Sequence, residues 1–142
     1  MKNSLYRPAA IACGIVELLV LAPTWFTFGG APGQKAYNAS GFGLTGIIPG
    51  QDHSPTGGVG VLMVLVGVVA ALALLVIPTD DKAAMVLAVA GLIATGVILA
   101  DRGPRMTGVS ATWAPYVAAA VWLTAVVVCR QAQPASRTPR RP

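Results

Sequence analysis

Residues 59–100 read VGVLMVLVGVVAALALLVI, then PTDDK, then AAMVLAVAGLIATGVILA. Two nearly uncharged apolar runs, 59–77 and 83–100, thus flank one short polar turn, 78–82. Each run is close to the roughly 20 residues that a helix needs to cross a bilayer. Because the turn is so short, we expect an antiparallel helical hairpin in which Thr79 or Asp80 caps the second helix.

Two further apolar runs, 8–26 and 113–129, lie on either side of this hairpin. With 55% hydrophobic and 11% charged residues, the chain is too apolar for an ordinary soluble domain. Backbone groups in lipid must be hydrogen-bonded within their own segment, which favours helices. The sequence therefore predicts an all-α membrane protein, an antiparallel bundle of four transmembrane helices at residues 8–26, 59–77, 83–100 and 113–129. A cleaved signal peptide is disfavoured because Glu17 interrupts the first run.

The basic residues predict the orientation of this bundle. If both termini are cytoplasmic, seven basic residues lie inside and three outside, which satisfies the positive-inside rule. The inside set is Lys2, Arg7, Lys82, Arg130, Arg137, Arg140 and Arg141, and the outside set is Lys35, Arg102 and Arg105. The tail, 131–142, is too polar to fold, so we expect a disordered basic segment that binds anionic lipid. Its charge is better explained by lipid than by nucleic acid, which we do not expect as a partner.

The first outside loop, 27–58, is long and rich in glycine and proline. Loops of this length are often functional. Within it, residues 37–48 could form a short β-hairpin over the outer end of the bundle, although its glycines weaken a strand.

Two aromatic pairs are predicted at the same outer membrane interface. Trp25 and Phe26 end the first helix, and Trp113 and Tyr116 open the fourth. Aromatic side chains are enriched at that depth, so we expect an anchoring belt.

Glu17 is the one carboxylate inside an apolar run. It follows Pro8 by nine residues, which at about 1.5 Å per residue places it near the middle of a roughly 30 Å hydrocarbon core. It shares a helix face with Ala10, Cys13 and Gly14, so we expect it to point into a helix–helix interface. Thr95 and Thr124 fall at similar depth and are its predicted hydrogen-bond partners.

Three interpretations of Glu17 stay open at this stage. It is a protonated structural bridge to Thr95 or Thr124, a contact to a partner membrane protein, or a proton or cation site in a transporter. Residues 12–17, ACGIVE, resemble the first helix of small multidrug-resistance transporters, which carry a membrane-embedded glutamate. That resemblance implies proton coupling at Glu17, but the long first loop departs from that family.

Small residues repeat along the predicted helices, a pattern that lets helices approach closely. The candidate packing positions are Ala10, Gly14, Gly60, Gly67, Ala84, Ala88 and Gly91. We find no spacing typical of a metal site, a nucleotide loop or a catalytic triad, so we expect no cofactor and no enzymatic activity.

The overall plan resembles the actinobacterial tryptophan-associated transmembrane proteins. The residues that carry the resemblance are Thr24-Trp25-Phe26, the glycine-rich region 41–46 and the turn 78–82. The family implies a four-helix layout and no catalytic residues. We therefore expect an accessory subunit of a larger complex in a bacterial inner membrane, serving respiration, secretion or envelope assembly. The alternatives are a homo-oligomeric proton-coupled transporter that uses Glu17, and an immunity or exclusion protein that binds through the outer loop.

Overall fold

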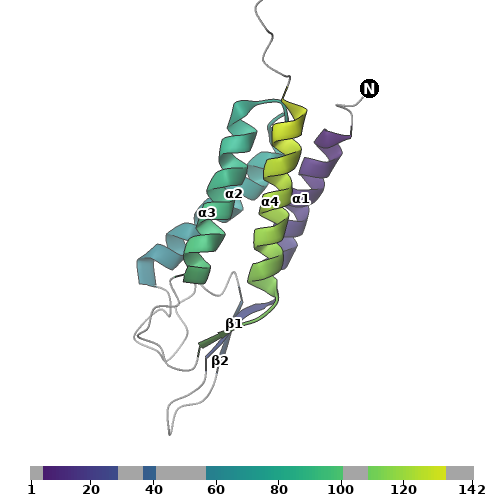
Figure 1. Ribbon diagram of the computed structural model, residues 1–142. Coiled ribbons are helices and arrows are strands. Elements are labelled where there is room, and N and C mark those ends of the chain that lie inside the picture. The colour runs from purple at the N-terminus through teal and green to yellow at the C-terminus, as the bar shows by residue number, and fades with distance from the viewer. Residues whose placement is uncertain (1–4, 29–36, 41–56, 101–108, 134–142) are drawn as a thin grey trace, which may run out of the picture.

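The computed structural model describes residues 5–28, 37–40, 57–100 and 109–133. Four helices run along one another and a small β-sheet lies at one end of them (Figure 1). The elements follow in the order α1 (Tyr6–Val20), β1 (Thr24–Phe28), β2 (Tyr37–Ser40), α2 (Gly57–Val76), α3 (Lys82–Ala100), β3 (Val109–Ala111) and α4 (Ala114–Ala132).

The four helices pack as an antiparallel ring. α1 contacts α2 and α4, and α3 contacts the same two helices from the other side. The chain begins and the last helix ends at the end of the bundle opposite the sheet (Figure 1). Three helices lie close to their predicted limits, and the predicted α2–α3 hairpin is present. The side chain that caps α3 is Asp81 rather than Thr79 or Asp80, because its Oδ1 accepts the amide of Ala83 at 2.9 Å.

The first helix is shorter than predicted. We expected it to continue to residue 26, but α1 ends at Val20 and Thr24–Phe28 is a strand. Pro23 explains the break, because it lacks an amide proton and disfavours helical geometry in the residue before it. The segment after it alternates threonine with aromatic residues, which suit a strand better than a helix.

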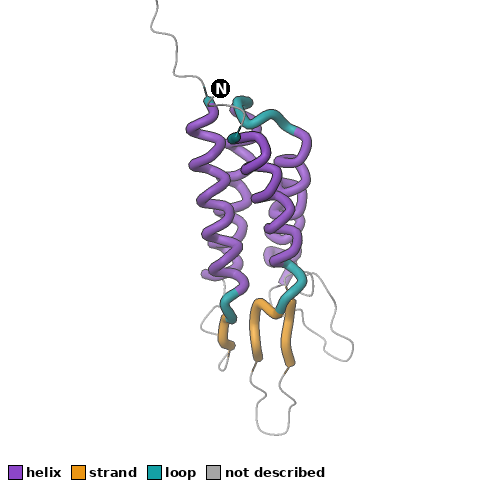
Figure 2. The backbone as a smooth tube through the Cα atoms, turned by 90° about the vertical axis from the view of Figure 1, so that its right-hand side faces the viewer, coloured by secondary structure: helices purple, strands orange, loops and turns teal. Residues whose placement is uncertain are grey.

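The sheet joins two connections that are far apart in sequence, because β1 and β2 lie between α1 and α2 and β3 lies between α3 and α4. Its strand order is β2-β1-β3, and both pairings are antiparallel. Figure 2 shows the strands side by side beyond the helix ends. Residues 37–40 form a strand, and this strand pairs with β1. The rest of the predicted hairpin, 41–48, lies outside the described residues.

Hydrogen bonds fix the sheet to the helices. The indole Nε1 of Trp25 donates to the carbonyl of Val20 at 2.8 Å, which satisfies a carbonyl in the last turn of α1. The hydroxyl of Thr112 donates to the carbonyl of Thr24 and accepts the amide of Ala114 at 3.3 Å. The end of α1 and the start of α4 are therefore held together through β1.

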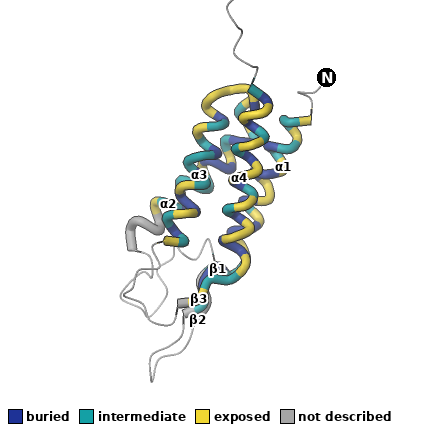
Figure 3. The backbone as a smooth tube through the Cα atoms, viewed as in Figure 1, coloured by how far each residue is buried: buried dark blue, intermediate teal, exposed yellow. Residues whose placement is uncertain are grey.

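Alanines make up much of the bundle interior, around a few large side chains such as Leu74 and Trp122, and many other large apolar side chains face outward. Ala10, Ala84, Ala88, Ala118 and Ala125 have no exposed surface. The helix exteriors carry exposed large apolar side chains. Figure 3 marks the exposed positions along the helices in yellow. Among them are Ile15 and Leu19 on α1, Leu65, Val69 and Leu72 on α2, Val86 and Ile93 on α3, and Leu123 and Val127 on α4.

Two of the helices, α3 and α4, are long and apolar enough to cross a membrane. In α2 the apolar stretch Leu62–Val76 is shorter by the same measure, within the residues whose side chains are described. The protein is thus mostly helical, with at least two helices suited to a bilayer.

Candidate functional site

Glu17 lies inside the bundle. Its side chain is 3% exposed, and the buried face of α1 also includes Ala10, Cys13, Gly14 and Val20. This is the face that the helical spacing predicts. The carboxyl group therefore points toward neighbouring helices of its own chain, away from any lipid or partner protein outside the bundle.

Close helix packing leaves little space around this carboxyl group. A Cβ atom on Gly14 would lie 2.8 Å from the carbonyl oxygen of Ala71, so α1 and α2 approach almost to backbone contact one turn from Glu17. On the other side, Glu17 lies against the backbone of Trp122 in α4. Glu17 is therefore enclosed between two helices at a tight junction.

One oxygen of Glu17 is left without a partner. Within the described part of the chain, its Oε1 is buried and accepts no hydrogen bond. An unsatisfied buried polar group costs about 1–3 kcal/mol of stability. A carboxyl group with one unpaired oxygen can carry a proton, or it can accept a hydrogen bond from a donor that enters the bundle.

The predicted partners, Thr95 and Thr124, do not bind Glu17. The hydroxyl of Thr95 is buried but donates to the carbonyl of Gly91 at 3.0 Å. Thr124 is exposed, and its hydroxyl donates to the carbonyl of Ala120 at 2.9 Å. The prediction considered only how deep each threonine lies along its helix. Contact with Glu17 also depends on the direction in which the side chain points from the helix axis. On α4 the inward positions are Trp122 and Ala125, and Thr124 lies on the outer side.

Two free cysteines lie near Glu17. Cys13 is one helical turn away on α1, and Cys129 of α4 is close enough to Cys13 to interact with it electrostatically. Both are buried and neither forms a disulfide. Among the described residues, no three His, Cys, Asp or Glu side chains are grouped as a metal ion would require.

The small residues of α3 are used for packing within the chain. Ala84, Ala88 and Gly91 are buried, and a Cβ on Gly91 would lie 2.5 Å from the indole ring of Trp122. Gly67 does not match its predicted role, because open space surrounds the position that its Cβ would occupy. The side-chain surroundings of Gly60 lie outside the described part.

The two aromatic pairs of the predicted belt differ in exposure. Trp113 and Tyr116 are 61% and 55% exposed at the sheet end of α4, as an interfacial anchor requires. Trp25 and Phe26 are each 2% exposed and belong to a core cluster with Val20. The strand β1 turns these two side chains toward the bundle, which a helix continuing to residue 26 would not have done.

Sequence reasoning used Arg7 only as a charge that sets orientation, and missed its position. Its Nη2 donates to the carbonyl of Leu75 at 2.9 Å, near the end of α2. The sequence does contain evidence for this position. Arg7 precedes Ala10 and Gly14 at helical spacing and therefore lies on the buried face of α1.

Comparisons with protein-family models, curated proteins and solved structures give no match for this chain. The resemblance to the tryptophan-associated transmembrane proteins therefore stays a prediction from layout. The loop residues that would serve an immunity or exclusion protein, 29–36 and 41–56, lie outside the described residues.

Proposed function

We propose that this protein spans a bacterial inner membrane four times, with both termini cytoplasmic, and acts as a non-enzymatic accessory subunit of a larger membrane complex. The observation that carries the proposal is the outward placement of large apolar side chains on all four helices. Such surfaces need lipid or other helices around them. Because its small-residue faces pack against other helices of the same chain, the protein would bind a partner through these outer faces.

The sheet supports an interaction role at the outer end. It ties the α1–α2 connection, which holds β1 and β2, to the α3–α4 connection, which holds β3. Two connections that are paired in one sheet bind a partner at lower entropic cost than two separate loops.

Site-specific photo-cross-linking in native membranes tests this proposal. A photoreactive amino acid is placed at the exposed Leu65, Val69, Ile93 and Leu123, one at a time, with the fully buried Ala70 as the control position. We expect one or two exposed positions to give a discrete adduct with a larger membrane protein, and Ala70 to give none. Adducts with lipid alone at every exposed position would contradict an accessory role.

A second candidate function is a proton-coupled transporter. The specific observation in its favour is the buried, unpartnered Oε1 of Glu17, since ionisable groups inside a membrane bundle often mark proton pathways. A transporter would purify as a defined homo-oligomer and release protons on addition of a substrate, and Glu17→Gln would abolish that release. Proton release that is unchanged in Glu17→Gln would exclude Glu17 as the coupling site.

A further inference from the structure

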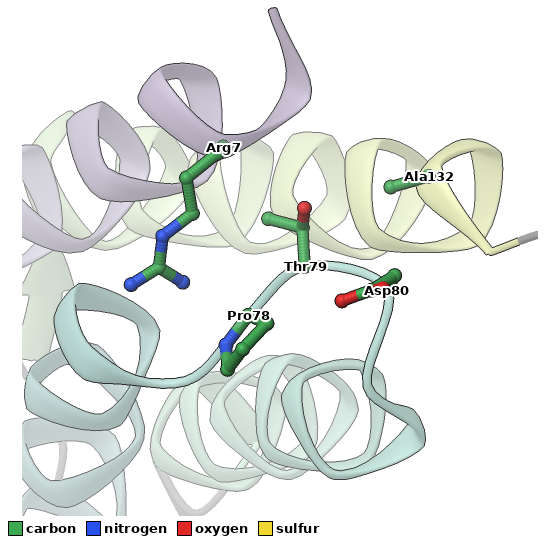
Figure 4. A pocket seen from close by; sticks show the side chains of 5 residues that line it. All are labelled: Arg7, Pro78, Thr79, Asp80 and Ala132. Atoms are coloured by element: carbon green, nitrogen blue, oxygen red, sulfur yellow. The ribbon is translucent and has the colours of Figure 1, made fainter. Parts of the chain in front are cut away.

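A pocket lies at the end of the bundle that carries both chain termini. Its volume is about 380 Å³, and it is lined by Arg7, Pro78, Thr79, Asp80 and Ala132 (Figure 4). This volume falls at the low end of the roughly 300–1,000 Å³ that is typical of small-molecule sites. The pocket is formed by the first turn of α1, the α2–α3 turn and the last turn of α4, so only the assembled bundle creates it.

Arg7 supplies an unused hydrogen-bond donor at this pocket. Its Nη2 is held by the carbonyl of Leu75, while its Nη1 is buried and has no partner within the described residues. The contact with Leu75 fixes the guanidinium in place, because a cation near the C-terminal end of a helix is favoured by the helix dipole. The guanidinium is therefore held in one orientation at the pocket wall.

A second unused donor lies at the same end of the bundle. Gln133 directly follows the pocket residue Ala132, and its Nε2 is also buried without a partner among the described residues. Thr79, which is 6% exposed, adds a hydroxyl group to the lining. Buried donors without acceptors are costly, so an acceptor-rich ligand would be stabilised here.

We propose that this pocket binds a phosphate group and that the guanidinium of Arg7 is its anchor. A guanidinium and a phosphate form short, charge-assisted hydrogen bonds with matched geometry. The phosphate comes either from an anionic lipid headgroup or from a soluble phosphate compound, since both present the same oxygens. This site is separate from Glu17 and does not depend on the accessory function.

Asp80 is the one acidic residue in the lining. It is exposed, and Figure 4 shows Thr79 between it and Arg7. Solvent around an exposed carboxylate weakens its repulsion of an anion, so Asp80 reduces the affinity for phosphate without blocking the site.

The test measures phosphate binding by the full chain in two arms. In one arm, the protein is released from nanodiscs of phosphatidylglycerol or phosphatidylcholine, and native mass spectrometry counts the retained lipids. In the other arm, inorganic phosphate is titrated against the detergent-solubilised protein and the shift in melting temperature is recorded. Retention of phosphatidylglycerol alone identifies a lipid headgroup, and a shift with inorganic phosphate identifies a soluble ligand.

Arg7→Gln is compared with Arg130→Gln, which removes the same charge from an exposed position in the last turn of the neighbouring helix. We expect Arg7→Gln to weaken binding by roughly 10-fold or more, and Arg130→Gln to leave it nearly unchanged. Asp80→Asn changes an exposed side chain and should tighten binding severalfold. Equal binding by Arg7→Gln and Arg130→Gln, no binding in either arm, or unchanged affinity in Asp80→Asn would each overturn the proposal.

Discussion

Glu17 is the residue whose role the structure defines most sharply. It is enclosed by its own chain, and its Oε1 is buried without a partner in the described part. The hydroxyls of Thr95 and Thr124 donate to carbonyls of their own helices, so Glu17 has neither of its predicted bridging partners.

Replacing Glu17 with leucine tests this conclusion. We expect Glu17→Leu to stabilise the bundle by about 1–3 kcal/mol, because it removes an unsatisfied buried polar group at similar volume. The free energy of unfolding in mixed detergent micelles measures the effect, with the exposed Thr124→Val as the control. Destabilisation by Glu17→Leu would show that Glu17 makes a hydrogen bond that holds the helices together.

Gly91 is the second residue whose size matters. A Cβ there would lie 2.5 Å from the ring of Trp122, whereas a Cβ on Gly96 of the same helix meets nothing within 4 Å. Gly91→Ala should therefore destabilise the bundle by about 1–3 kcal/mol, and Gly96→Ala should not. Thermal unfolding in detergent compares the two variants. Equal stability would mean that α3 and α4 do not pack through Gly91.

At the scale of elements, hydrophobic runs predicted three helices closely, and they placed the end of the first helix too late in the chain. α2, α3 and α4 lie close to the predicted runs because an uncharged run near bilayer length has few alternatives to a helix. The segment Thr24–Phe28 is also apolar, but it is a strand because it pairs with Tyr37–Ser40 and with Val109–Ala111, and the second of these comes from a distant part of the chain. Local composition does not encode such pairings.

For the candidate site too, the local sequence predicted some features of the structure and not others. Helical spacing predicted the buried face of α1, since Ala10, Gly14 and Glu17 repeat at three and four residues. Depth alone did not predict which hydroxyl reaches Glu17, because depth fixes position along a helix and not direction around it.

The hydroxyl of Thr112 connects β1 with α4, and its hydrogen bonds can be tested by mutation. It caps α4 and binds the carbonyl of Thr24, so Thr112→Val should destabilise the protein by about 1–2 kcal/mol. Thr27→Val removes a longer, exposed hydrogen bond of 3.4 Å to Ser110 and is the matched control. Hydrogen exchange of the first turn of α4 should rise in Thr112→Val alone. Equal exchange in both variants would contradict the capping role.

For the whole molecule, the sheet restricts the possible topologies. Because β1, β2 and β3 form one sheet, the residues that follow α1 and precede α4 must lie at the same end of the bundle. The start of α1, the α2–α3 turn and the end of α4 lie together at the opposite end (Figures 1 and 2). Four spans, with the termini on the positively charged inner side, satisfy both conditions.

Cysteine labelling in intact cells tests this central claim most directly. In a background with Cys13→Ala and Cys129→Ala, single cysteines replace Leu5, Asp80, Ser110 and Gln131, all of which are exposed. A membrane-impermeant maleimide should label Ser110→Cys in intact cells, and the other three only after permeabilisation. Labelling of Ser110→Cys and Asp80→Cys from the same side would contradict the four-span bundle.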